Sequence, residues 1–191
     1  MRVLITGAAG MLGATLAQEL DKEFDIYSTG KSNYLNNRVT NFFPFDLSNG
    51  KFEQLLKWAR PNIIIHCAAI TNLDYCEKNQ DETLLVNSES VKRFLDYNLD
   101  SKIIYISSES VFPDHLEKAN ELDQTNPINI YGKSKQLGEN YIIINGVKYI
   151  RSVLDEETEF DRAPAVSIED VIYQAKQTAK QMERRSFNQF L

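Results

Sequence analysis

The sequence predicts a doubly wound α/β fold, in which helices cover both faces of a parallel sheet. Short apolar runs typical of buried strands alternate along the chain with amphipathic runs typical of helices. The first apolar run leads directly into a glycine-rich turn, Gly7-Ala-Ala-Gly10-Met-Leu-Gly13, and then into a helical pattern. A chain of 191 residues suits one such domain, with room for a small appendage.

The expected elements follow in order from the apolar pattern. Six short apolar runs indicate strands at Val3–Thr6, Asp25–Ser28, Phe42–Phe45, Ile63–Cys67, Ile103–Ser107 and Val147–Arg151. Apolar residues recur at helical spacing in longer runs, which indicates helices at Met11–Leu20, Phe52–Arg60, Glu82–Asp96 and Tyr131–Ile144. A last helix is expected from Ile168 to Arg185, because its basic end suits a helix C-terminus.

The composition narrows the function class and the compartment. A formal net charge of -6 argues against general binding to nucleic acid or to a membrane surface. No apolar run approaches the ~20 residues of a membrane span, and the first residues lack the pattern of a secretory signal. Cys67 and Cys76 have no CxxC spacing, which predicts neither a disulfide framework nor a zinc site. We therefore expect a cytoplasmic protein.

The glycine turn is the first candidate binding feature. Glycines let the backbone approach a pyrophosphate, which then lies at a helix N-terminus where free N–H groups favour anions. Because this turn stands between a strand and a helix, it predicts a dinucleotide site over Gly7 to Gly13. The alternative is a tight turn that needs glycine only for its conformation.

Tyr131 and Lys135 form the second candidate feature. They stand four residues apart at an expected helix start, so both side chains should lie on one helical face. An ammonium beside a phenol favours the phenolate, and we expect Lys135 to lower the pKa of Tyr131. Such a tyrosine exchanges a proton with a carbonyl or alcohol oxygen near neutral pH. The alternative is a tyrosine that only packs.

Several expected strand ends should line one crevice. In parallel sheets covered on both faces, ligands lie beyond the carboxyl ends of the strands. These ends carry the Gly7 turn, Ala68–Ala69, Ser107–Ser108 and Arg151–Ser152. His66 ends a buried strand and is interpreted as a core histidine, and neither His66 nor His115 has a partner at metal-ligand spacing, so no metal site is expected.

Five stretches together resemble the extended short-chain dehydrogenase/reductase family, and most closely its dTDP-4-dehydrorhamnose reductases. They are Gly7–Gly13, Arg60–Ala69, Val86–Asn87, Tyr105–Phe112, and Glu121–Lys135 continuing to Gly138-Glu139. The resemblance implies an NAD(P)-binding Rossmann domain over residues 1–151 and an abridged substrate lobe over 152–191. The segment beginning Val166-Ser-Ile-Glu-Asp also looks like a family motif that precedes a helix of that lobe. Two positions depart from the family pattern, since Glu109 replaces an aspartate and Ser110 an aromatic residue.

The resemblance also implies roles for individual residues. Tyr131 would be the acid, Lys135 would lower its pKa and bind the nicotinamide ribose, and Ser108 would hydrogen-bond the substrate oxygen. Without that context, Ser108 could equally be a strand-end hydroxyl that satisfies a loop. Asn87 would organise the backbone near the site. The implied cofactor-binding residues are Gly7, Gly10, Met11, Leu12, Gly13, Lys31, Asp46, Leu47, Ala68, Ala69, Tyr131 and Lys135.

Two of these positions leave alternatives open. Asp46-Leu47 resembles the family's adenine contact, but a helix N-cap region is the alternative. At the end of the second expected strand no acid is present to hold a ribose 2′-hydroxyl, and Lys31 could hold a 2′-phosphate. NADP is therefore expected. The alternative is NAD, in which case Lys31 would be a solvated loop residue.

Three functions remain open from the sequence. The first is an NADP-dependent reductase of the 4-keto group of a nucleotide-activated deoxysugar. The second is a non-catalytic cofactor-binding or regulatory subunit, favoured by the short part after Arg151, and the third is a reductase of a smaller carbonyl compound. The acidic run Asp155–Asp161 would repel a diphosphate, so we expect an open substrate side. A homodimer or partner subunit would then complete the site.

Overall fold

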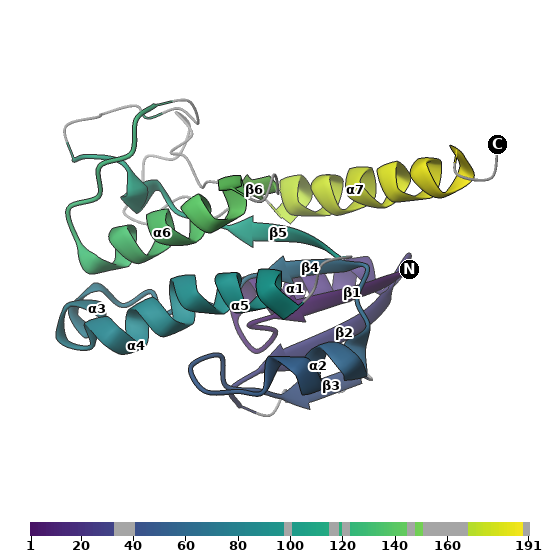
Figure 1. Cartoon of the computed structure of the whole chain (residues 1–191), viewed down its shortest axis with the longest axis horizontal. Helices are drawn as coiled ribbons and strands as arrows, with labels where there is room; N and C mark the ends of the chain where they lie inside the picture. The colour runs from purple at the N-terminus through teal and green to yellow at the C-terminus, as the bar shows by residue number, and fades with distance from the viewer. Residues whose placement is uncertain are drawn as a thin grey trace.

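A computed structural model of the chain describes residues 1–32, 41–97, 101–114, 119, 123–144, 148–150 and 168–188. Its centre is one six-stranded parallel sheet with the strand order β3-β2-β1-β4-β5-β6 (Figure 1). The strands are β1 (Arg2–Thr6), β2 (Asp25–Gly30), β3 (Asn41–Pro44), β4 (Ile63–His66), β5 (Lys102–Ile106) and β6 (Lys148–Ile150). This order confirms the predicted doubly wound α/β fold, because the chain starts at a central strand and winds outward first to one side and then to the other.

Helices lie on both faces of the sheet (Figure 1). One face packs against α1 (Met11–Leu20) and α7 (Ile168–Asn188), and the opposite face against α2 (Phe52–Ala59), α5 (Ser90–Tyr97) and α6 (Ile130–Ile144). Shorter pieces complete the chain, namely α3 (Leu73–Lys78), α4 (Gln80–Leu84), the π-helical turn η1 (Leu85–Glu89) and the 3-10 turn η2 (Glu109–Val111).

Strand β1 shows why the sheet is buried on both sides. Val3, Leu4 and Ile5 are completely buried, as expected for a continuous apolar run in a central parallel strand. Val3 and Ile5 pack on the side of α1, whereas Leu4 packs on the side of α2 and α5. This alternation follows from the two-residue period of a strand.

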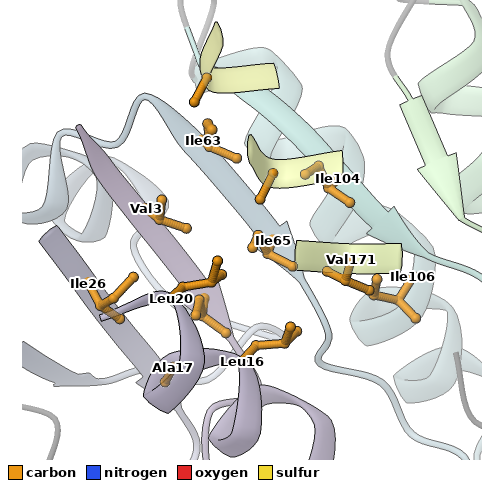
Figure 2. Packing of buried hydrophobic residues seen from close by; sticks show 13 residues of the cluster. Val3, Leu16, Ala17, Leu20, Ile26, Ile63, Ile65, Ile104, Ile106 and Val171 are labelled. Atoms are coloured by element: carbon orange, nitrogen blue, oxygen red, sulfur yellow. The ribbon is translucent and has the colours of Figure 1, made fainter. Parts of the chain in front are cut away.

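Helix α7 closes the sheet on the side of α1 (Figure 2). Val171, Ala175 and Ala179 recur at helical spacing and share one buried cluster with Ile65 and Ile106. Their small side chains allow the helix to lie close to the strands. Lys176 also pairs with Glu23 just after α1, with Nζ 2.5 Å from Oε1. Helix α7 is therefore part of the same core as the sheet. The proposed boundary between residues 151 and 152 lies outside the described residues.

Most expected elements are present with small shifts at their ends. Helix α1 has the predicted bounds, and α2 ends at Ala59 because Arg60 takes a left-handed φ of 42° and Pro61 follows. The single helix predicted at Glu82–Asp96 is instead α4, the π-helical turn η1 and α5 in succession. Helix α3 and the turn η2 were not predicted, because such short pieces carry little periodicity.

None of the helices described is long and apolar enough to cross a membrane. In the same parts of the chain, no group of three or more His, Cys, Asp or Glu side chains is placed to hold a metal ion.

Candidate functional site

A cleft of about 510 Å³ opens at the carboxyl ends of β1, β2 and β4. This is where ligands bind in doubly wound sheets, next to the point where the strand order reverses. The residues that line it come from four loops and from the α3–η1 segment: Thr6, Gly7, Gly10, Thr29, Gly30, Lys31, Phe45, Asp46, Leu47, Cys67, Ala68, Ala69, Ile70, Tyr75, Glu82 and Val86.

The glycine turn forms one wall of this cleft with bare backbone. Gly7 has a φ of +68°, and a Cβ added there would lie 2.8 Å from the backbone N and Cα of Ala68. A Cβ on Gly13 would lie 2.4 Å from the carbonyl oxygen of Gly7, so Gly13 lets α1 pack against the turn. Gly10 caps α1 without a side-chain hydrogen bond, which leaves the first N–H groups of the helix for a ligand. These features fit a dinucleotide pyrophosphate.

The loop after β4 forms the facing wall, and two buried polar side chains hold it. Asn87 Oδ1 accepts a hydrogen bond from Ile70 N at 2.7 Å, while Asn87 Nδ2 donates to Ile70 O at 2.9 Å. Thr6 Oγ1 accepts a hydrogen bond from Ala68 N at 3.2 Å. Both polar groups of the Ile70 backbone are thus satisfied by one side chain, which fixes the shape of this wall. Asn87 has the backbone contact that the resemblance implies.

Lys31 lies at the mouth of the cleft, just past the end of β2. Its Nζ is 3.3 Å from Asp46 Oδ2 and 3.5 Å from Glu82 Oε1. Contact with these two carboxylates, above all with Asp46, raises the pKa of Lys31. Lys31 is thus paired and charged, and its side chain is still 67% exposed. A ligand at the ribose position could reach it.

Asp46 stabilises a turn after β3. Its Oδ1 accepts hydrogen bonds from Ser48 N at 2.9 Å and from Ser48 Oγ at 2.7 Å. Burial opposes ionisation, but the bonds from Ser48 and the nearby Lys31 outweigh it and lower the pKa of Asp46. The N-cap of α2 is Lys51, so the interpretation of Asp46 as part of a helix N-cap is wrong.

Ser108 and Tyr131 come together at the other end of the carboxyl edge. Ser108 caps the turn η2 after β5 by accepting a hydrogen bond from Ser110 N at 3.2 Å. Tyr131 lies in the first turn of α6. The Ser108 hydroxyl lies close enough to the Tyr131 phenol to act on the pKa of Tyr131, which it lowers. Gly132 permits this approach, since a Cβ there would lie 2.0 Å from Ser110 O. A hydroxyl and a phenol in contact can bind one carbonyl oxygen together.

The pKa of Tyr131 differs from the expected direction. Burial raises this pKa above its ordinary value, and the nearby Ser108 hydroxyl only partly offsets that effect. The carboxylate of Glu109 raises it further. The expectation that Lys135 lowers the pKa of Tyr131 is therefore wrong for the structure described here. Helical spacing places the two residues on one face, but it does not determine where the ammonium points.

Lys135 is buried beneath the site rather than exposed in it. Its ammonium lies over the ring of Tyr105, 4.1 Å from the centroid, and the residue is 2% exposed. Burial lowers the pKa of Lys135 to about 7, although the neighbouring Glu139 opposes this shift. The hydroxyl of Tyr105 donates to Asn87 O at 3.0 Å, which connects this layer to the loop after β4.

Glu109 borders the pair from the side of η2. Its Oε2 is buried and has no hydrogen-bond partner, and burial raises the pKa of this carboxyl. The hydroxyl of Ser107 is also buried without a partner. Unsatisfied buried polar atoms are uncommon, and both of these lie beside the Ser108–Tyr131 pair.

His66 confirms the interpretation of a core histidine. It is 1% exposed, with Nδ1 2.7 Å from Thr6 Oγ1 and Nε2 3.0 Å from Ser90 Oγ. Burial lowers its pKa to about 3, so the ring is neutral. Cys67 follows it in the cleft wall, where burial raises the pKa of the thiol to about 12. Neither side chain is a reactive group in this state.

The predicted residues thus separate into two groups. Those that line the cleft are Gly7, Gly10, Lys31, Asp46, Leu47, Ala68 and Ala69. Met11 is 85% exposed, Leu12 packs against the core and Gly13 packs against the turn, and none of the three lines the cleft. Ser108, Tyr131 and Lys135 also lie outside the cleft lining.

The lining residues that sequence reasoning missed include Thr6, Thr29, Tyr75 and Glu82. The position of the two threonines at the ends of β1 and β2 was a usable signal, because strand ends face the crevice. Tyr75 and Glu82 carried no such signal, since they come from a helical segment that folds back over the mouth.

Comparisons with known proteins agree with this geometry. The family model described as the RmlD substrate binding domain matches residues 1–151. The chain is 32% identical over 145 residues to methionine adenosyltransferase 2 subunit beta of Danio rerio, a match that covers 74% of this chain and 43% of that relative. It is 31% identical over 153 residues to dTDP-4-dehydrorhamnose reductase of Aggregatibacter actinomycetemcomitans, covering 78% of this chain and 49% of the relative.

Solved structures give the same result. A dTDP-4-dehydrorhamnose reductase of Bacillus anthracis strain Ames, in complex with NADP, matches with a TM-score of 0.66 and 36% identity over 78% of this chain and 51% of that one. A hypothetical dTDP-4-dehydrorhamnose reductase from Sulfolobus tokodaii matches with a TM-score of 0.70 and 33% identity over 79% and 55%. The chain spans about half the length of these relatives. The chain belongs to the RmlD substrate binding domain family of extended short-chain dehydrogenase/reductases.

Proposed function

We propose that this chain acts as an NADP-dependent reductase on the 4-keto group of a nucleotide-activated deoxysugar. The observation that carries the proposal is the approach of Ser108, at the start of η2, to Tyr131, in the first turn of α6, at the carboxyl edge of a dinucleotide-type sheet. The similarity to dTDP-4-dehydrorhamnose reductases supports the substrate class. NAD is the alternative cofactor.

In this proposal the cleft residues hold the cofactor. The backbone of the glycine turn and the start of α1 would bind the pyrophosphate, Asp46 and Leu47 would border the adenine, and Lys31 would reach the ribose 2′-phosphate. Ala68 and Ala69 would form the facing wall. When bound, a reduced nicotinamide dinucleotide supplies the hydride that carbonyl reduction needs.

Ser108 and Tyr131 have separate tasks at the carbonyl. Ser108 would donate a hydrogen bond to the substrate oxygen and orient it. Tyr131 would give its phenolic proton to the oxygen as negative charge develops there. The raised pKa of Tyr131 keeps the phenol protonated at neutral pH, which suits an acid in the direction of reduction. Lys135 would support the site from below and contact the cofactor ribose only after its side chain turns away from Tyr105.

NADPH oxidation with dTDP-4-dehydrorhamnose tests the proposal. Tyr131→Phe should reduce turnover at least about hundredfold, the usual contribution of a positioned acid, and should leave NADPH binding unchanged. Tyr97→Phe is the matched control, because Tyr97 is 60% exposed at the end of α5. Measurable turnover that survives Tyr131→Phe unchanged would refute the acid role.

The relatives are about twice as long as this chain, and the proposal therefore also concerns what encloses the substrate. In the proposal, a second copy or a partner subunit supplies a wall over the substrate. Remote binding energy and water exclusion are what such a wall supplies. The acidic run Asp155–Asp161 lies outside the described residues, and the open substrate side stays a prediction.

A second function is a non-catalytic cofactor-binding or regulatory subunit. Two observations favour it, the similarity to methionine adenosyltransferase 2 subunit beta and the burial of Lys135 over Tyr105. Wild-type protein that binds NADPH but reduces no 4-keto deoxysugar nucleotide would support this function. Co-elution with a methionine adenosyltransferase catalytic subunit in size-exclusion chromatography would then identify the partner, and its absence would count against this candidate.

A further inference from the structure

A network of polar contacts bridges the mouth of the cleft. Lys31 Nζ lies 3.3 Å from Asp46 Oδ2 and 3.5 Å from Glu82 Oε1. Tyr75 donates its hydroxyl to Glu82 Oε2 at 2.5 Å. All four residues line the cleft, and they come from both of its sides. The network connects the end of β2 and the turn after β3 to the α3–α4 segment.

The charges of this network are not balanced. One ammonium faces two carboxylates, and each carboxylate is stabilised in its ionised form: the pKa of Asp46 is lowered and the pKa of Glu82 is lowered, the latter first by the hydrogen bond from Tyr75. The three groups together thus carry a net negative charge. A phosphate that approaches Lys31 meets this excess, whereas a neutral hydroxyl at the same place does not.

The two carboxylates have different structural tasks. Asp46 also accepts two hydrogen bonds from Ser48 and so holds the turn beside the cleft. Glu82 reaches Lys31 from the opposite side of the cleft, from helix α4. Glu82 is therefore the member of the network that can be changed without altering the loop that carries Lys31.

We propose that Glu82 is a specificity-determining residue that competes with the 2′-phosphate of NADP for Lys31 and so reduces the preference of the cleft for NADP over NAD. The inference rests on the proposed function, in which Lys31 reads the ribose 2′ position. A 2′-phosphate that binds Lys31 brings its negative charge beside Glu82, so the two anions compete for one ammonium. A 2′-hydroxyl, which carries no charge, leaves the pair in place.

The expected size of the effect is modest, because the pair is partly exposed. The side chain of Lys31 is 67% exposed and that of Glu82 is 34% exposed, so water screens their attraction. Removal of an ion pair of this kind should change the affinity for the phosphate by about two- to fivefold. Salt should reduce the difference further.

Calorimetric titration of NADPH and NADH into wild type, Glu82→Gln and Asp81→Asn tests the inference. Glu82→Gln should tighten NADPH binding about two- to fivefold and leave NADH binding unchanged. Asp81→Asn makes the same change of charge one residue away, on an exposed side chain that does not line the cleft. It should alter both affinities equally and only slightly.

A second pair of variants identifies Lys31 as the group for which Glu82 competes. In a Lys31→Met background, Glu82→Gln should no longer distinguish the two cofactors. Equal changes for NADPH and NADH in Glu82→Gln, or weaker NADPH binding, would overturn the inference while the proposed cofactor function stands. If the wild type binds neither dinucleotide, the proposed function fails, and the inference fails with it.

Discussion

Asn87 holds the backbone of Ile70 from both sides, since its Oδ1 accepts from Ile70 N and its Nδ2 donates to Ile70 O. Asparagine is unfavourable inside a helix, and Asn87 lies within the π-helical turn η1. The wider turn presents the amide to the loop after β4. The π-turn is thus the structural basis of one wall of the cleft, in agreement with the frequent occurrence of such turns at functional sites.

Replacement of this amide should affect both stability and binding. Asn87→Ala leaves the Ile70 N–H without its partner and leaves the Ile70 carbonyl only the weak donor Cys76 Sγ, and should reduce the free energy of unfolding by about 2 kcal/mol. NADPH binding should weaken because the loop loses its fixed shape. Urea unfolding and calorimetry measure the two effects, with the exposed Asn140→Ala as control. Equal behaviour of both variants would contradict the role of Asn87.

Two glycines of the turn should respond differently to substitution. Gly13→Ala places a Cβ 2.4 Å from Gly7 O and should destabilise the fold by about 1–3 kcal/mol, as overpacking does. At Gly10 a Cβ has only one close neighbour, Gly7 O at 3.2 Å, and the position is exposed. Gly10→Leu should therefore keep the fold while its side chain blocks the pyrophosphate. Thermal unfolding and NADPH titration separate the two effects, and unchanged NADPH binding in Gly10→Leu would contradict the assignment of the turn.

Burial of Lys135 should make stability depend on pH. Because burial lowers the pKa of Lys135 from 10.5 to about 7, the unfolded chain binds more protons than the folded chain between these values. The free energy of unfolding should therefore rise with pH from about 7 to about 9. Above about pH 9 the Cys67 thiol acts in the opposite direction, since its pKa is raised to about 12 in the fold.

Urea unfolding at a series of pH values measures this slope. Lys135→Met keeps an unbranched side chain and removes the titrating group, so the rise should become smaller. Lys133→Met is the matched control, since Lys133 is exposed on the same helix. A slope that is the same in all three proteins would show that Lys135 does not titrate in this range.

Helix α7 should be required for the fold of the sheet. Val171 is completely buried against Ile65 and Ile106 (Figure 2), so Val171→Ala should reduce the free energy of unfolding by about 1–3 kcal/mol. Tyr173→Ala, on the exposed side of the same helix, should change it by no more than about 0.5 kcal/mol. If both variants unfold like wild type in urea, α7 is a detachable appendage.

The fold was predictable because its signals are local. Buried strands such as Ile63–His66 appear as apolar runs, and α1 appears as an apolar period after glycines, so the parallel sheet follows from the order of the elements. The glycine turn was also predictable, since its conformation and its close approach to Ala68 both require glycine. Short helices such as α3 were not predicted, because they have too few residues for a hydrophobic period to be recognised.

The amino-acid sequence by itself thus determined the class of fold, the place of the crevice and the residue types available in it. Only the tertiary structure decided how they are used: Ser108 with Tyr131, Lys135 over Tyr105, and Lys31 between Asp46 and Glu82. The tertiary structure also decided the position of α7, which packs on the part of the sheet beside α1. The physical reason is that periodicity reports only which face of an element is apolar. The direction of a long side chain and the pKa of a buried group depend on neighbours that are distant in sequence.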